Sequence, residues 1–187
     1  MKIILPKTFY DPMLIDTPLF FTAGPSLGGD DWQQRCAIGL QARMPNCHVA
    51  IPTIYESDHP LYQYKVSGNN SYFARQLFWE RFYMRVAGIP AKKKMGCILF
   101  WLPCESKTNP RKDGQPYARD TYGELGEWRA RMEFEHARVV VGSEAGFPGL
   151  DQINCNFEEM LGRDFPIYST LESTVEAAIA MAEVGHC

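Results

Sequence analysis

Short apolar runs alternate along most of this chain with longer stretches in which apolar side chains recur every three or four residues. The apolar runs predict five strands, at residues 19–24, 47–51, 96–102, 138–142 and 165–168. The stretches of helical period predict helices from Asp30 or Asp31 to about 43, and at 71–86, 121–135, 152–161 and 171–184. Residues 1–18 are rich in turn breakers and predict an extended arm.

This alternation predicts the fold class. A strand followed by a helix, repeated without a break in composition or an internal repeat, is typical of a single α/β domain, here residues 1–187 with the arm at 1–18. Uninterrupted apolar strands are typical of a parallel sheet covered on both faces. With right-handed crossovers and the common order 2-1-3-4-5, we expect a doubly wound five-stranded parallel sheet with helices on both faces. In that order the strands at 19–24 and 96–102 are neighbours, and a crevice opens beyond their carboxyl ends.

Composition and charge exclude several classes of partner. The formal net charge of −3 argues against a broad contact with nucleic acid, and the single basic run, Lys92–Lys94, predicts a solvated turn, with phosphate binding as the alternative. The chain has no run of about 18 apolar residues that could span a membrane, and its start lacks the features of a signal peptide. The six cysteines form no C-x-x-C pair and the four histidines have no zinc-type spacing. We therefore expect a cytoplasmic protein with reduced thiols, no metal, no cofactor, and no nucleic-acid or membrane partner.

The turn after the first predicted strand is a candidate binding site. It reads Gly24-Pro-Ser-Leu-Gly-Gly-Asp-Asp31 and leads into a helix, so its backbone N–H groups can hold phosphates or sugar hydroxyls. The candidate residues are Gly24, Pro25, Ser26 and Asp31. The alternative is a plain tight turn in which an Asp caps the helix.

Glu124 is the candidate for chemistry. It lies in the stretch Tyr117–Trp128, at the start of a helix that follows a buried strand and a long polar loop at 103–118. A carboxylate at the carboxyl edge of a parallel sheet is placed to meet a ligand. Thr121-x-x-Glu124 also has the pattern of a capping box, which is the alternative role for this side chain. Gly123 and Gly126 flank the carboxylate and cost about 1 kcal/mol each in a helix, which indicates that another group approaches closely.

Four motifs together resemble one enzyme family. They are Phe21-Thr-Ala-Gly-Pro25, Trp79-Glu80, Ile98-Leu-Phe-Trp101 and Tyr122-Gly-Glu-Leu-Gly-Glu-Trp128. Over about residues 19–182 the chain is similar to the nucleoside 2-deoxyribosyltransferase superfamily, and most similar to the subgroup called nucleoside 2-deoxyribosyltransferase-like.

The resemblance implies a flavodoxin-like fold and chemistry at the N-glycosidic bond of a nucleoside or nucleotide. It implies that Glu124, the Glu of the Glu-Leu-Gly motif, is the nucleophile that forms a glycosyl–enzyme intermediate, which a second base or water then resolves. It also implies a second carboxylate that holds or protonates the base, for which Glu80 is the best match. A charged side chain on the exposed face of a helix is the alternative for Glu80.

Three further residues are candidates for substrate binding. Trp101 and Tyr122 can stack on a nucleobase, with core packing as their alternative. Arg119 can meet a phosphate, with a surface ion pair to Asp120 or Glu127 as its alternative.

Two classes of function follow from these residues. One is an enzyme that cleaves or transfers the N-glycosidic bond, and the other is a non-catalytic nucleotide-binding or sensor module. Because related enzymes complete their pockets with a neighbouring subunit, and because the helix at 72–83 is rich in aromatic residues, we also expect a homo-oligomer.

Overall fold

A computed structural model describes residues 1–65, 72–89, 96–162 and 164–184, with the backbone alone for 72–75. Over these residues, its centre is one parallel sheet of six strands in the order β1-β3-β2-β4-β5-β6. The strands are β1 (Lys2–Ile4), β2 (Leu19–Ala23), β3 (His48–Ala50), β4 (Cys97–Leu102), β5 (Val139–Ser143) and β6 (Ile167–Tyr168). The predicted α/β class and the parallel sheet are confirmed, and the order of the five predicted strands fits a flavodoxin-like fold.

The predicted number of five strands is wrong, because the N-terminal arm contributes a sixth. Lys2–Ile4 forms β1 and pairs in parallel with β3, with Ile3 opposite Val49. Three residues are too few to establish a hydrophobic period, and Pro6 ends the run immediately. The rest of the arm is irregular apart from a short 3₁₀ helix at Pro12–Leu14.

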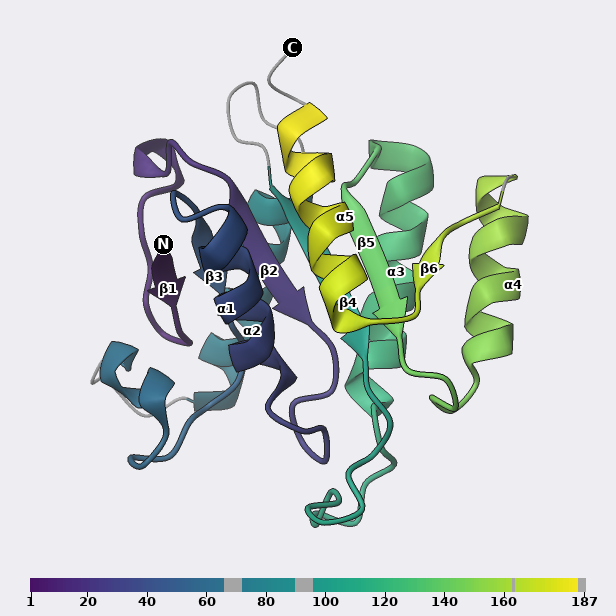
Figure 1. Ribbon diagram of the computed structural model, residues 1–187, viewed down its shortest axis with the longest axis horizontal. Coiled ribbons are helices and arrows are strands. Elements are labelled where there is room, and N and C mark those ends of the chain that lie inside the picture. The colour runs from purple at the N-terminus through teal and green to yellow at the C-terminus, as the bar shows by residue number, and fades with distance from the viewer. Residues whose placement is uncertain (66–71, 90–95, 163, 185–187) are drawn as a thin grey trace.

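Within the described part of the chain, five α-helices cover the sheet on both faces, as expected (Figure 1). They are α1 (Trp32–Arg43), α2 (Tyr72–Gly88), α3 (Arg119–Glu135), α4 (Leu150–Leu161) and α5 (Leu171–Glu183). Helices α1 and α5 pack on one face, and the buried residues of α2, α3 and α4 form a second core on the other. The basic run Lys92–Lys94 lies outside the described residues.

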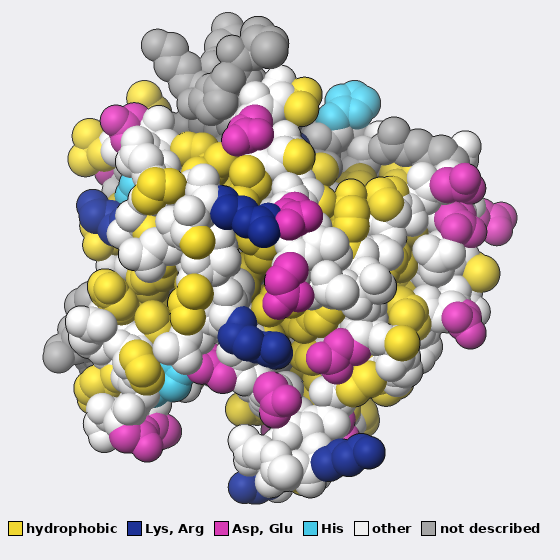
Figure 2. Space-filling model, in the orientation of Figure 1, with side chains coloured by type: hydrophobic (Ala, Val, Ile, Leu, Met, Phe, Trp, Pro, Cys, Tyr) yellow, Lys and Arg dark blue, Asp and Glu magenta, His cyan; other side chains and the backbone are white. Residues whose placement is uncertain are grey.

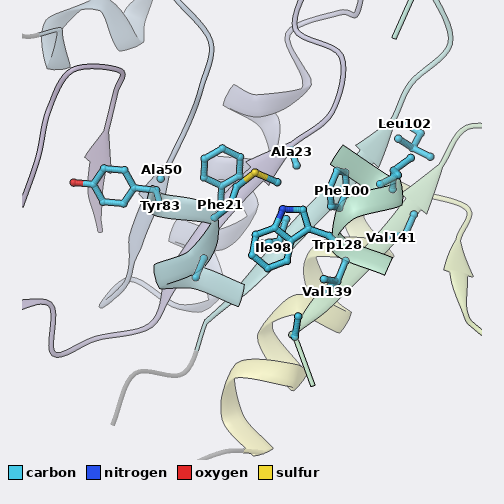
Figure 3. Packing of buried hydrophobic residues seen from close by; sticks show 14 of the residues in the cluster. Phe21, Ala23, Ala50, Tyr83, Ile98, Phe100, Leu102, Trp128, Val139 and Val141 are labelled. Atoms are coloured by element: carbon cyan, nitrogen blue, oxygen red, sulfur yellow. The ribbon is translucent and has the colours of Figure 1, made fainter. Parts of the chain in front are cut away.

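The strands supply both cores because successive side chains of a strand point to opposite faces. In β4, Ile98 and Phe100 join the core under α2 and α3, whereas Leu99 and Trp101 join the core under α1 and α5. Figure 3 shows Trp128 of α3 lying against this sheet beside Ile98. All six residues of β4 are buried, so the central strand holds the helices of both layers in place.

On the face that carries α1 and α5, acidic and basic side chains are interspersed (Figure 2). In the part of the chain that the structure describes, no helix is long and apolar enough to cross a membrane.

Candidate active site

A cavity of about 770 Å³ opens at the carboxyl edge of the sheet. Its walls come from four segments that the fold brings together: the turn after β2, residues 52–54 after β3, one side of α2, and the loop and first turns of α3. Gly24 and Glu124 both line it, so the turn after β2 and the α3 carboxylate meet at one edge of the sheet. A ligand in this place lies at the topological switch point of the sheet, where open α/β folds bind their ligands.

The turn after β2 is held tightly against β4. Gly24 has a φ of +142°, and a Cβ built there would lie 2.2 Å from the carbonyl oxygen of Trp101. The Trp32 indole donates a hydrogen bond to the carbonyl oxygen of Pro25 at 2.9 Å. On the other side, the Ser106 amide donates to the carbonyl oxygen of Gly28 at 2.7 Å and joins this turn to the 103–118 loop. Gly24, Pro25 and Ser26 all line the cavity, as their candidate role requires.

Helix α3 begins two residues earlier than the sequence predicts, and this removes the capping role of Glu124. Ala118 is the N-cap residue, in a left-handed conformation with a φ of 57°, and no side chain caps the helix. Tyr117, the residue before Ala118, is held in place because its hydroxyl donates a hydrogen bond to the carbonyl oxygen of Pro103 at 2.8 Å. Thr121 therefore lies inside the first turn, and Glu124 is free of the capping box that the pattern Thr121-x-x-Glu124 predicted.

Two carboxyl groups from different helices share the cavity. Glu124 of α3 and Glu80 of α2 both line it, and both are half-buried. Burial, followed by the negative charges of Glu80, Asp120 and Glu127, raises the pKa of Glu124 to about 8. Burial also raises the pKa of Glu80, while the hydrogen bond from Gln76 opposes this rise. Both carboxyl groups therefore hold a proton more readily than an exposed glutamate does.

Gln76 fixes the position of Glu80. Its side-chain amide donates to Glu80 Oε1 at 2.9 Å and to the carbonyl oxygen of Pro52 at 3.1 Å. The amide therefore ties α2 to the segment after β3. Sequence reasoning missed this residue, because its importance depends on a contact between segments 24 residues apart.

Three guanidinium groups also line the cavity, from Arg81, Arg111 and Arg119. Arg111 is held by Asp113 through two bonds of 2.6 and 2.8 Å, so its position in the 103–118 loop is fixed. Arg119 pairs with Asp120 at 3.2 Å and donates a hydrogen bond to the side-chain oxygen of Gln115 at 2.7 Å. It therefore lines the cavity and also forms the surface ion pair that is its alternative role. Among the described residues, the Arg81 guanidinium forms no ion pair or hydrogen bond, although it lines the cavity.

Three of the predicted binding residues do not line this cavity. Trp101 is 2 % exposed and lies in the core under α1 and α5, because the alternation along β4 directs it to the face opposite α2 and α3. Tyr122 lies two positions before Glu124, about 200° away around the helix, and its hydroxyl donates to the carbonyl oxygen of Pro148 at 2.8 Å. Asp31 accepts from His59 Nε2 at 2.8 Å, and its side chain does not cap α1.

Searches with protein-family models and with curated protein sequences find no match to this chain. Within the described residues, no group of His, Cys, Asp and Glu side chains is arranged to hold a metal ion.

The two glycines that flank Glu124 offer a matched test of the cavity. A Cβ at Gly123 or at Gly126 would meet nothing within 4 Å, so neither is required by packing, and Gly123 alone lines the cavity. Because Ala is favoured over Gly in a helix, we expect Gly123→Ala and Gly126→Ala each to stabilise the fold by about 1 kcal/mol in chemical denaturation. Only Gly123→Ala is expected to weaken the binding of a ligand in this cavity, because its methyl group occupies space beside Glu124. Equal ligand binding by the two variants would contradict the placement of a ligand along this face of α3.

Proposed function

We propose that this protein cleaves or transfers the N-glycosidic bond of a nucleoside or nucleotide, with Glu124 as the nucleophile. The observation that carries the proposal is the pair of carboxyl groups, Glu124 and Glu80, which face one cavity from two helices beside the Gly24–Ser26 turn. The resemblance of the Glu-Leu-Gly and Ala-Gly-Pro motifs to the nucleoside 2-deoxyribosyltransferase superfamily supports the same reading.

In the proposed reaction, a carboxylate oxygen of Glu124 attacks the anomeric carbon of the sugar. The bond from this carbon to the base nitrogen breaks, its electron pair goes to the base, and Glu80 supplies or directs the proton that the base takes up. Water or a second base then attacks the glycosyl ester and releases the Glu124 carboxylate. The cavity volume of about 770 Å³ lies within the range of roughly 300–1,000 Å³ that is typical of small-molecule sites.

The alternative is a non-catalytic nucleotide-binding or sensor module. It would be favoured by a Glu124 that caps its own helix, lacks polar neighbours and faces no open pocket. Instead, Glu124 shares an open cavity with Glu80, Asp120 and Glu127, whose negative charges raise its pKa, and Ala118 occupies the N-cap. This arrangement favours the enzyme over the binding module.

The test is mass spectrometry of the purified protein mixed with a panel of nucleosides and nucleotides. We expect free base in the mixture and, after rapid acid quenching, a glycosyl adduct on the peptide that contains Glu124. A protein that binds members of the panel and releases no base would support the binding module instead.

The pH dependence of base release tests the environment of Glu124. Because the nucleophile must be ionised and its pKa is raised to about 8, kcat/KM is expected to rise about tenfold per pH unit below that value and to level off above it. Glu80→Gln removes a negative charge that raises this pKa, so the rising limb is expected to move to lower pH. This shift of the rising limb along the pH axis is independent of any fall in the maximum kcat/KM that Glu80→Gln also causes. A limb that stays in place in Glu80→Gln would contradict the coupling of the two carboxyl groups.

A homo-oligomer in the cytoplasm stays a prediction. It is supported by the side chain of Phe78 on the aromatic-rich helix α2, which is 63 % exposed. The rings of Trp79 and Tyr83 on the same helix are instead buried in the core and do not support an interface. The side chains of Tyr72 and Phe73 lie outside the described residues. The described cysteines are all free thiols.

A further inference from the structure

Two of the three guanidinium groups that line the cavity are already engaged by carboxylates. Arg111 bonds to both carboxylate oxygens of Asp113, at 2.6 and 2.8 Å, and its side chain is only 9 % exposed. Its guanidinium therefore fixes the loop and has little freedom to meet a ligand. Arg119 pairs with Asp120 at 3.2 Å, and both of these side chains are exposed.

The acidic side chains of the cavity wall are also paired or are protonated more readily than usual. Glu127 accepts two hydrogen bonds from Arg131, at 2.9 and 3.1 Å. Glu80 accepts from Gln76, and burial raises the pKa of both Glu80 and Glu124. The four carboxyl groups that line the cavity therefore repel an anion less than four ionised and unpaired carboxylates would.

Arg81 differs from the other charged residues of the wall. Among the described residues its guanidinium forms no ion pair or hydrogen bond, and its side chain is exposed where it lines the cavity. Arg81 follows Glu80 on α2, so this helix presents a half-buried carboxyl group and an exposed guanidinium to the same cavity. A guanidinium has five N–H donors in a planar fork that matches two oxygens of a phosphate. The unpaired charge indicates that the ligand supplies an anion.

We propose that the ligand of this cavity is a nucleotide and not a nucleoside, and that Arg81 binds the phosphate on its sugar. The sugar and base rest on the proposed function, whereas the phosphate rests on Arg81. This assignment differs from the expectation from sequence, which gave a phosphate to Arg119. The anomeric carbon lies at Glu124 in the half-buried part of the cavity, and the phosphate stays at the exposed side, where its charge keeps part of its hydration.

Calorimetric titration of Glu124→Gln tests the proposal, because this variant binds a substrate without consuming it. The ligands are the nucleosides of the panel and their 5′- and 3′-monophosphates. We expect at least one monophosphate to bind about tenfold or more tightly than its nucleoside. In the double variant with Arg81→Met, the monophosphate is expected to weaken about tenfold more than the nucleoside does.

Two further variants serve as comparisons in the same background. Arg85→Met is the matched control, because Arg85 lies one turn further along α2, is exposed, and does not line the cavity. It is expected to change neither affinity. Arg81→Lys keeps the charge and loses the planar fork, so its affinity for the monophosphate should fall between those of Arg81 and Arg81→Met.

Two outcomes would overturn this inference. One is equal binding of every nucleoside and its monophosphates. The other is a preference for the monophosphate that survives Arg81→Met and is lost in Arg119→Met, which would move the phosphate to Arg119.

The failure of this inference is distinguishable from the failure of the proposed function. Base release by the wild type with no preference for monophosphates would overturn the phosphate site and leave the proposed function intact. Binding of a monophosphate that depends on Arg81, without base release by the wild type, would support the phosphate site and overturn the proposed reaction. A panel in which no member binds would overturn both.

Discussion

Replacing Glu124 by Gln is expected to reduce base release by about a thousandfold or more, because a covalent step is lost rather than a contact. Gln has the same size as Glu and can still donate and accept hydrogen bonds, yet its amide cannot form the glycosyl ester. The quantity to measure is kcat/KM for the nucleoside or nucleotide that the panel identifies.

The same substitution is expected to raise stability at alkaline pH. In the folded protein, burial and then the neighbouring negative charges raise the pKa of Glu124 from its ordinary value of 4.5 to about 8. Between these values the folded state binds more protons than the unfolded state, so the contribution of Glu124 to stability falls as pH rises through this window. Gln carries no charge and avoids the loss. The melting temperature of Glu124→Gln should therefore match the wild type near pH 4 and exceed it near pH 9.

Glu133→Gln is the matched control for both measurements. Glu133 lies on the same helix, is exposed, and does not line the cavity. We expect it to change neither base release nor the pH dependence of the melting temperature. Full base release by Glu124→Gln would refute the nucleophile assignment, whereas a melting temperature that follows the wild type at every pH would refute the buried, charge-crowded environment.

Strands β4 and β5 were predictable because each contains a clear apolar run. Cys97–Leu102 is apolar throughout, Val139–Ser143 begins with three valines, and each strand is buried along its whole length. Lys2–Ile4 was missed because a three-residue strand is stabilised by its pairing with β3 and not by a local preference. The start of α3 was missed for a related reason. A left-handed Ala118 ends the loop, and a hydrogen bond between Tyr117 and Pro103 fixes that turn.

Sequence reasoning placed the backbone of the site better than its side chains. Gly24 and Glu124 were predicted to meet because both follow neighbouring parallel strands, and they line one cavity. The contributions of Arg81, Arg111 and Gln76 depend on how α2 and the 103–118 loop fold over the sheet edge, which no short motif records. Trp101 packs in the core, which is the alternative given for it, and the face of β4 that it occupies depends on a register that the apolar run itself does not reveal.

Gly24→Ala is expected to destabilise the fold by roughly 3 kcal/mol or more, because the new side chain adds both backbone strain and a steric clash. The φ of +142° is unfavourable for alanine, and the new Cβ would lie 2.2 Å from a backbone oxygen of β4. Gly114→Ala is the control, because Gly114 also has a positive φ, of +72°, but nothing lies within 4 Å of its Cβ position. It should cost roughly 1 kcal/mol, the conformational strain alone. Denaturant unfolding of both variants separates the cost of the strain from the cost of the clash.

The same turn forms a wall of the cavity, so Gly24→Ala that still folds should also lose base release. A stability of Gly24→Ala equal to that of Gly114→Ala would refute the tight contact between this turn and β4.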